Sequence, residues 1–298
     1  PWWKTNIAYS FYIIFFAGFL YVVRRSELNR REQKARIREN ELQLKATEAE
    51  KRAIMAENER KTKELEEARQ LQLSMLPKVL PKLPNLEISA FMRTATEVGG
   101  DYYDFIVQDG GLLNIGFGDA TGHGLQAGTM VTLMKGFFTS NASKLELLEF
   151  MNSCSAMIKE VNLGRILMSF SFLRIKECRL ELSSAGMPPV YYYNGKTNEV
   201  EEILVQGMPL GAMKKGSYKM VEKELNRGDV LLLITDGLPE QMNNNDEMFD
   251  YSRVKNHFNE IAGNTPDVII EKLIRSGDEW MQDKIQADDI TLVVIKVK

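Results

Sequence analysis

Aspartates recur at the ends of strand-like runs in the C-terminal two thirds of the chain, each beside a turn residue. They are Asp101 in Gly-Gly-Asp, Asp119 in Gly-Asp-Ala-Thr-Gly-His-Gly, Asp236 in Thr-Asp-Gly, and the pair Asp288 and Asp289. A single aspartate at a turn is ordinary, because its side chain hydrogen-bonds the local backbone. Carboxylates that converge repel one another unless a cation lies between them, and hard divalent cations prefer oxygen ligands. We therefore predict a metal site built from these aspartates.

The first two aspartates can be placed opposite each other from the sequence alone. Strand-like runs at 102–108 and 112–118 flank an Asp-Gly-Gly turn, whose residues tolerate the positive φ angles of a tight hairpin. Asp101 and Asp119 are equidistant from Gly110, so an ungapped hairpin pairs them at its open end. Cross-strand neighbours have Cβ atoms roughly 5 Å apart, close enough for two carboxylates to share a metal ion.

The second group of aspartates follows the same logic. Asp236 ends the apolar run 230–234, whose lack of alternation indicates a buried strand. Asp288 and Asp289 precede the last apolar run, 290–297. If these two strands are antiparallel neighbours, the end of one and the start of the other lie at the same edge of a sheet.

The composition excludes several other classes of protein. With 44% apolar and 27% charged residues among 298, the chain is foldable, and 38 basic against 41 acidic residues give no general attraction to nucleic acid. Cys154 and Cys178 show no Cys-x-x-Cys spacing, so neither a disulfide framework nor a zinc site is indicated. His123 and His257 are the only histidines, which disfavours zinc chemistry and a Ser-His-Asp triad.

The N-terminal segment, 1–23, has the character of a membrane span. Residues 7–23 are uncharged and apolar, with Trp2 and Trp3 ahead of them and tyrosines within. The run is at the short end of the length that crosses a hydrocarbon core about 30 Å thick. A cleaved signal peptide is the alternative. However, the segment has no small-residue cleavage site, and Lys4 is the only basic residue before the apolar run.

A basic cluster follows the apolar run: Arg24, Arg25, Arg30, Arg31, Lys34, Arg36 and Arg38. By the positive-inside rule, this side of the membrane is cytoplasmic. We expect a single-pass protein of the cytoplasmic membrane with everything after the span in the cytoplasm. The cluster could also contact anionic lipid headgroups, although a plain stop-transfer flank explains it equally well.

Segment 24–76 reads as a coiled-coil signalling helix. It contains no Pro or Gly, and helix-forming residues dominate it until Pro77. A spacing of four and three residues repeats along one face, at Leu42, Ala46, Ala49, Ala53 and Ala56. Arg60 and Lys63 interrupt this seam, as a stutter would. We expect a parallel homodimer whose weak, alanine-rich seam transmits a signal; a passive spacer helix is the alternative.

Segment 77–298 mixes short strands with separate helices. We expect helices at 125–140, 145–161, 251–262 and 266–281, and strands at 86–92, 102–108, 112–118, 167–175, 179–184, 190–193, 218–225, 230–234 and 290–297. Runs of strands with segregated helices predict an α+β domain of layered antiparallel sheets.

The order of the motifs in this segment resembles the SpoIIE-type serine phosphatases, the bacterial branch of the protein phosphatase 2C (PPM) superfamily. The motifs are Glu97-Val98-Gly99-Gly100-Asp101-Tyr102-Tyr103-Asp104, Gly118-Asp119 with Gly122-His123-Gly124, Ser184-Ala185-Gly186, Met208-Pro209-Leu210-Gly211, Thr235-Asp236-Gly237 and Asp288-Asp289-Ile290-Thr291. The resemblance implies a PPM-type sandwich of two antiparallel β-sheets flanked by helices, here preceded by a transmembrane helix and a long coiled-coil helix.

The resemblance also implies two Mn²⁺ or Mg²⁺ ions per catalytic domain. The implied ligands are Asp101 for one ion, Asp119 bridging both, the main-chain carbonyl of Ala120, and Asp236 and Asp288 for the other ion. Asp289 stands where a relative often has Asn, so it ranks below Asp288. Met187 replaces a frequent His. His123 is a candidate general acid, but it lies three residues after Ala120, and a structural turn histidine is the interpretation we favour.

The expected activity is a metal-dependent protein serine/threonine phosphatase in bacterial signal transduction. A metal-activated water held through Asp119, Asp101 and Asp236 would hydrolyse the phosphoester, with no covalent nucleophile. Asp104 could support the metal ligands by hydrogen bonding, or be a solvated turn residue. Family analogy suggests a phosphorylated anti-sigma-factor antagonist as the substrate. The alternatives are a non-catalytic scaffold with the same fold and a hydrolase of small phosphoesters.

The charge distribution around the apolar segment generates a topology prediction. Because the basic cluster follows the span, residues ahead of 7 should be extracytoplasmic and 77–298 cytoplasmic. Protease treatment of sealed, right-side-out membrane vesicles should leave 77–298 intact until the vesicles are lysed. Digestion of this region without lysis would contradict the orientation.

Overall fold

A computed structural model of the chain describes residues 1, 5–95, 98–122 and 124–298. It divides into two compact units, Pro1–Lys63 and Glu64–Lys298, which are described separately. The candidate general acid His123 and Glu97 of the first motif lie outside the described residues.

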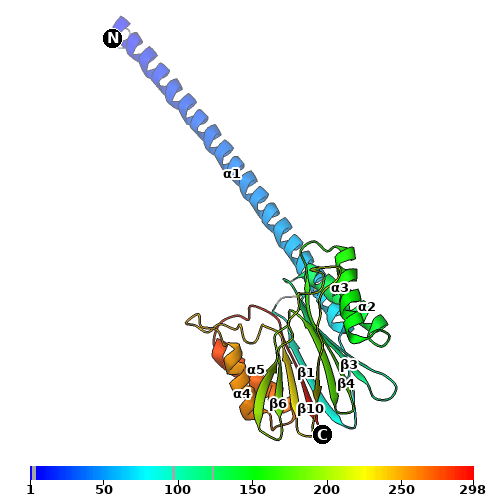
Figure 1. The fold of residues 1–298 in the computed structure, drawn as a ribbon. Helices are drawn as coiled ribbons and strands as arrows, with labels where there is room; N and C mark the ends of the chain where they lie inside the picture. Colours follow the sequence, from blue (N-terminus) through cyan, green and yellow to red (C-terminus); the bar gives the residue numbers. More distant parts are fainter. Residues whose placement is uncertain (2–4, 96–97, 123) are drawn as a thin grey trace. The chain divides into compact units, whose positions relative to one another are not determined.

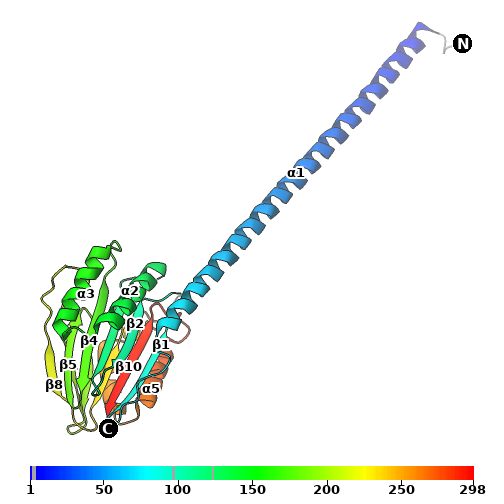
Figure 2. The ribbon, with the colours of Figure 1, turned by 90° about the vertical axis from the view of Figure 1, so that its right-hand side faces the viewer.

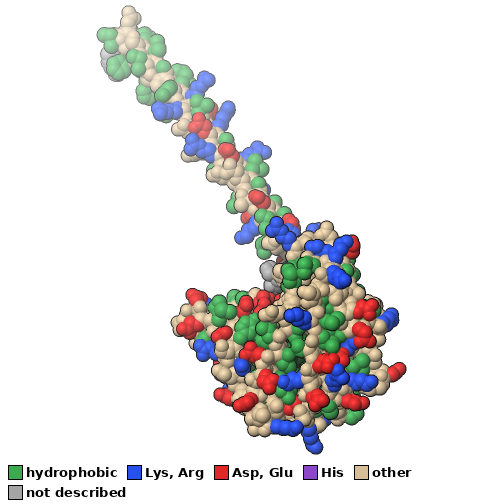
Figure 3. Space-filling model, viewed as in Figure 1, with side chains coloured by type: hydrophobic (Ala, Val, Ile, Leu, Met, Phe, Trp, Pro, Cys, Tyr) green, Lys and Arg blue, Asp and Glu red, His purple; other side chains and the backbone are tan. Residues whose placement is uncertain are grey.

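The long helix α1, Asn6–Met75, contains all of the first unit's regular structure and ends in the second unit. Its end agrees with the prediction, because Pro77 disfavours helical geometry in the residue before it. Apolar side chains cover its N-terminal part, and charged side chains of both signs cover the part that follows (Figure 3). Within the described residues, α1 is long and apolar enough to cross a membrane by length and composition. Coiled-coil pairing stays a prediction.

The second unit is built on two five-stranded antiparallel sheets (Figure 1). Sheet A has the order β1-β10-β9-β6-β7, and sheet B has the order β2-β3-β4-β5-β8. The bounds of sheet A are β1 Leu86–Arg93, β6 Val190–Asn194, β7 Glu199–Ile203, β9 Val230–Ile234 and β10 Ile290–Val297. Those of sheet B are β2 Asp101–Val107, β3 Leu113–Ala120, β4 Met168–Lys176, β5 Arg179–Ala185 and β8 Val221–Glu224.

Two pairs of helices cover the outer faces of the sheets. Helices α2 (Leu125–Asn141) and α3 (Leu147–Val161) pack on sheet B, as Figure 2 shows, and bury an apolar cluster that includes Phe138 and Phe150. Helices α4 (Tyr251–Ile261) and α5 (Pro266–Met281) pack on sheet A. The predicted sandwich of two antiparallel sheets flanked by helices is therefore confirmed.

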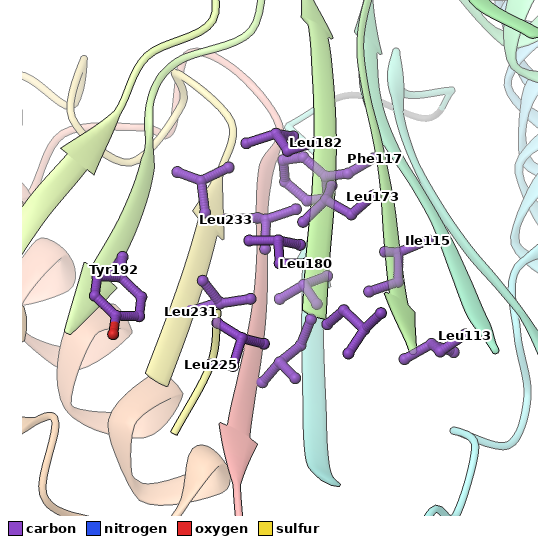
Figure 4. Close-up of a cluster of buried hydrophobic side chains, with 14 of the residues drawn as sticks. Leu113, Ile115, Phe117, Leu173, Leu180, Leu182, Tyr192, Leu225, Leu231 and Leu233 are labelled. Carbon is purple, nitrogen blue, oxygen red and sulfur yellow. The ribbon is translucent and has the colours of Figure 1, made fainter. Parts of the chain in front are cut away.

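The core between the sheets follows from alternation along the strands. In β3, Leu113, Ile115 and Phe117 point inward and are almost fully buried among leucines of β4, β5 and β9 (Figure 4). The residues between them face α2, where a Cβ on Gly116 would lie 2.9 Å from the ring of Phe138. Burying leucine- or phenylalanine-sized side chains stabilises the fold by roughly 1.5–3 kcal/mol each.

Strand β7 was not predicted. It is a short edge strand in which Glu199, Glu201 and Glu202 are exposed, so its sequence contains no apolar run from which a strand could be predicted. The available signal was the Asn-Gly turn after β6, which continues β6 into a hairpin. The strand expected at 218–225 is confined to Val221–Glu224, because β8 is an edge strand that pairs with β5 alone.

Candidate metal centre

The β2–β3 hairpin places Asp101 directly opposite Asp119, as predicted. The backbone approaches closely at this end, because the N–H of Ala120 donates to the carbonyl of Gly100 at 2.9 Å. A Cβ on Gly100 would lie 2.7 Å from the Ala120 oxygen and 2.9 Å from Oδ1 of Asp119. Glycine at this position therefore allows the aspartates and the Ala120 carbonyl to gather at one edge.

Strands β9 and β10 are antiparallel neighbours, which confirms the second expected placement. Asp236 follows β9 and Asp288 precedes β10, so both lie at the edge where these strands meet. A Cβ on Gly237 would lie 1.9 Å from the carbonyl oxygen of Asp289 and 3.2 Å from that of Asp288. The two segments are thus in main-chain contact, which only a residue without a side chain permits.

Two threonines join the sheets at this edge through Asp101. The hydroxyls of Thr235 and Thr291, both from sheet A, donate to Oδ2 of Asp101 at 2.9 and 2.5 Å. The Thr291 N–H in turn donates to the Thr235 hydroxyl at 2.9 Å. We did not predict this role. The signal that could have indicated it is a Thr placed within three residues of an aspartate in both motifs of sheet A.

Asp289 holds the main chain around Asp101. Its Oδ1 accepts from the N–H of Ala95 at 2.8 Å, and its Oδ2 accepts from the N–H of Gly100 at 2.7 Å. Its side chain is buried, whereas Asp288 is exposed. These bonds occupy the carboxylate of Asp289, which supports ranking Asp288 above it as a metal ligand.

The carboxylates at this edge affect one another electrostatically. Burial raises the pKa of Asp119 to about 8, with further increases from the charges of Asp236, Asp288 and Asp289. Burial also raises the pKa of Asp236 to about 6, and Asp288 adds to that shift. The pKa of Asp101 rises well above its ordinary value, first through burial and then through Asp119. Carboxylates from both sheets therefore converge on one region.

This donor set fits a hard divalent cation. It supplies anionic oxygens that repel one another, and Mg²⁺ and Mn²⁺ prefer such ligands. Within the described part of the chain, no three acidic, His or Cys side chains stand close enough together to hold a metal as they are.

Asp104 does not support this centre, contrary to our expectation. Its side chain points from β2 toward α2, where Oδ2 accepts from the Tyr102 hydroxyl at 3.0 Å and from Lys135 Nζ at 2.7 Å. Alternation along the strand explains this, because Asp101 and Asp104 are three residues apart and so face opposite sides. Asp104 is also buried, so it is not a solvated turn residue either.

The last turns of α1 contact the loop before Asp101. Gln72 is buried, and its Nε2 donates to the Gly99 carbonyl at 2.6 Å while its Oε1 accepts from the Gly99 N–H at 3.0 Å. On the other side, a Cβ on Gly99 would lie 2.3 Å from Oδ2 of Asp289. This loop is therefore held between the helix end and the C-terminal motif, which sequence reasoning missed.

The fold places this chain in the PPM (protein phosphatase 2C) class of serine/threonine phosphatases. Two antiparallel sheets with paired helices outside are the features of that class present here. The chain belongs to the Stage II sporulation protein E (SpoIIE) family. The sequence profile of that family matches residues 109–298, which is more than half of the chain.

Individual relatives agree with this assignment. The chain is 26% identical over 242 residues to phosphoserine phosphatase RsbU of Bacillus subtilis, covering 79% of this chain and 70% of RsbU. The SiaA-PP2C domain of Pseudomonas aeruginosa has a similar structure, with a TM-score of 0.73, 20% identity, and coverage of 81% of this chain and 98% of that domain. RsbX in complex with magnesium is also similar, with a TM-score of 0.56, 17% identity, and coverage of 74% and 99%.

Gly237 gives a direct test of the close approach between the aspartate segments. Gly237→Ala should lower the free energy of unfolding by about 1–3 kcal/mol, as overpacking does, and should weaken Mn²⁺ binding by separating Asp236 from Asp288. Urea unfolding and calorimetric titration with Mn²⁺ measure the two effects.

Gly136→Ala is the matched control. Gly136 lies within α2 with open space around it, so a Cβ there should be neutral or stabilise the helix by about 0.5–1 kcal/mol. Equal stability and equal Mn²⁺ affinity for the two variants would show that the segments around Gly237 can separate without loss.

Proposed function

We propose that the chain is a metal-dependent protein phosphatase that hydrolyses phosphoserine or phosphothreonine in bacterial signal transduction, using two Mn²⁺ or Mg²⁺ ions. The observation that carries the proposal is the convergence of Asp101, Asp119, Asp236 and Asp288 from both sheets at one edge of a SpoIIE-family domain. The similarity to RsbX, a protein solved in complex with magnesium, supports the choice of metal.

Each aspartate has a separate role in this proposal. Asp119, whose pKa is raised by the charges of three neighbouring aspartates, would be a ligand of both ions. Asp101, whose orientation is set by hydrogen bonds from Thr235 and Thr291, would hold one ion. Asp236 and Asp288 would hold the other, with the Ala120 carbonyl as a further ligand. Two bound cations would supply a water of lowered pKa and neutralise charge on the phosphoryl oxygens.

The proposed substrate is a phosphorylated protein. Support comes from the similarity to RsbU, which is named a phosphoserine phosphatase. By family analogy, the substrate is a phosphorylated anti-sigma-factor antagonist. A non-catalytic scaffold is disfavoured, since all four carboxylates are present.

The N-terminal part is proposed to anchor and regulate the enzyme. Residues 7–23 would cross the cytoplasmic membrane once, with the phosphatase in the cytoplasm, and 24–76 would form a parallel homodimer. The contact between Gln72 and Gly99 supports regulation through this helix, because Gly99 lies two residues from Asp101.

Asp119→Asn should abolish Mn²⁺-dependent turnover of a phosphoserine protein, because it removes the carboxylate that would hold both ions. Burial and repulsion raise the pKa of Asp119, so the neutral amide should leave the unfolding temperature unchanged or raised. Asp289→Asn should reduce turnover less, since an amide still accepts one of its backbone hydrogen bonds.

The same enzyme preparation should hydrolyse the phosphoserine protein far faster than a small aryl phosphate. Similar rates for both substrates would favour the small-phosphoester hydrolase.

Near-wild-type turnover by Asp119→Asn at saturating Mn²⁺ would refute the role assigned to Asp119.

Insertions after Ala56 test the coiled coil. Three or four residues change the phase of the seam, whereas seven residues preserve it, so turnover should change more with the shorter insertions. Replacing Ala46, Ala49 and Ala53 with Leu should strengthen one packing and lock activity high or low. If all variants show the same turnover and the same response to an upstream signal, the helix is only a spacer.

A further inference from the structure

The segment that carries Asp288 is held largely by polar contacts. It joins Met281, the end of α5, to Ile290, the start of β10, and Ile285 within it is 90% exposed. Asp288 is also exposed, and its Oδ1 accepts a hydrogen bond from the Asp289 N–H at 2.8 Å. Since apolar burial contributes little here, the position of Asp288 depends on the hydrogen bonds that reach this segment.

Gln286 connects Asp288 to the edge of sheet A. Its Nε2 donates to the carbonyl oxygens of Asp288 at 2.8 Å and Arg93 at 2.9 Å. Its Oε1 accepts from Nε of Arg93 at 2.5 Å. The side-chain amide of Gln286 thus binds both the main chain and the side chain of Arg93, and it holds the main chain of Asp288 at a fixed place relative to them.

Arg93 is itself fixed at both ends of the segment. It is the last residue of β1 and pairs with Ile290, the first residue of β10. Its guanidinium forms a bidentate ion pair with Asp278 in the last turn of α5, at 2.6 and 3.1 Å. Bidentate pairing sets the orientation of a planar guanidinium, so Nε is directed at Gln286.

We propose that Arg93, acting through Gln286, is a positioning residue that sets the affinity for the divalent cation held by Asp236 and Asp288. The inference rests on the proposed function, which takes these aspartates as ligands. The side chains of Arg93 and Asp278 are 33% and 42% exposed, and exposed ion pairs contribute little to global stability. Loss of Arg93 should therefore appear mainly in metal binding.

The test is calorimetric titration of the full chain in detergent micelles with Mn²⁺, in the absence of substrate. Arg93→Gln and Gln286→Met should each weaken Mn²⁺ binding about 10- to 100-fold, as changes in the partners of metal ligands do. The Mn²⁺ concentration for half-maximal turnover should rise in parallel, while kcat at saturating Mn²⁺ stays close to the wild-type value.

Two further variants separate positioning from simple ion pairing. Arg93→Lys can still pair with Asp278 but lacks the Nε donor to Gln286, so it should lose Mn²⁺ affinity like Arg93→Gln. Arg275→Gln is the matched control, because Arg275 lies on α5, pairs with Glu279 and is 76% exposed in its side chain. Its Mn²⁺ affinity should be that of the wild type.

The double variant Arg93→Gln/Gln286→Met should bind Mn²⁺ no more weakly than whichever single variant has the lower Mn²⁺ affinity. The reason is that the two side chains act through the same hydrogen-bonded connection. Wild-type affinity in Gln286→Met, or fully additive losses, would overturn the inference. If Arg93→Gln unfolds, Gln286→Met decides alone, since its side chain has a similar size. A wild-type chain that binds no Mn²⁺ would instead overturn the proposed metal dependence.

Discussion

The candidate centre depends on a carboxylate buried between two sheets. Asp101 belongs to sheet B, yet both hydroxyls that it accepts come from Thr235 and Thr291 of sheet A. Burial of this carboxylate is unfavourable without such donors, and the nearby Asp119 makes it more so. The two sheets are therefore hydrogen-bonded together at the edge where their aspartates converge and repel one another, and a cation is the group that would relieve that repulsion.

Local patterns carried much of the fold. The Asp-Gly-Gly turn predicted the register of Asp101 against Asp119, because hairpin geometry is determined within a few residues. Long apolar runs predicted β9 and β10 with their observed bounds. Strand β7 was missed because an edge strand rich in exposed Glu has neither an apolar run nor clear alternation.

The positions of the aspartates were predictable from the sequence, and the contacts around them were much less so. The side chain of Asp104 faces α2 because of alternation along the strand. The closeness of Asp104 to Asp101 in the sequence suggested instead that both face the same site. Gln72 and Arg93 were invisible for another reason, since their partners Gly99 and Gln286 lie 27 and 193 residues away. Contacts of this kind depend on tertiary packing, which no local pattern encodes.

Three glycines at this edge give the site an unusual genetic character. A Cβ on Gly99, Gly100 or Gly237 would lie 2.3, 2.7 or 1.9 Å from an oxygen atom of a neighbouring segment. Every amino acid that a single nucleotide change can reach from a glycine codon carries a Cβ. Any amino-acid change at these three codons therefore requires a neighbouring atom to move: the side chain of Asp289 at Gly99, and the main chain at Gly100 and Gly237.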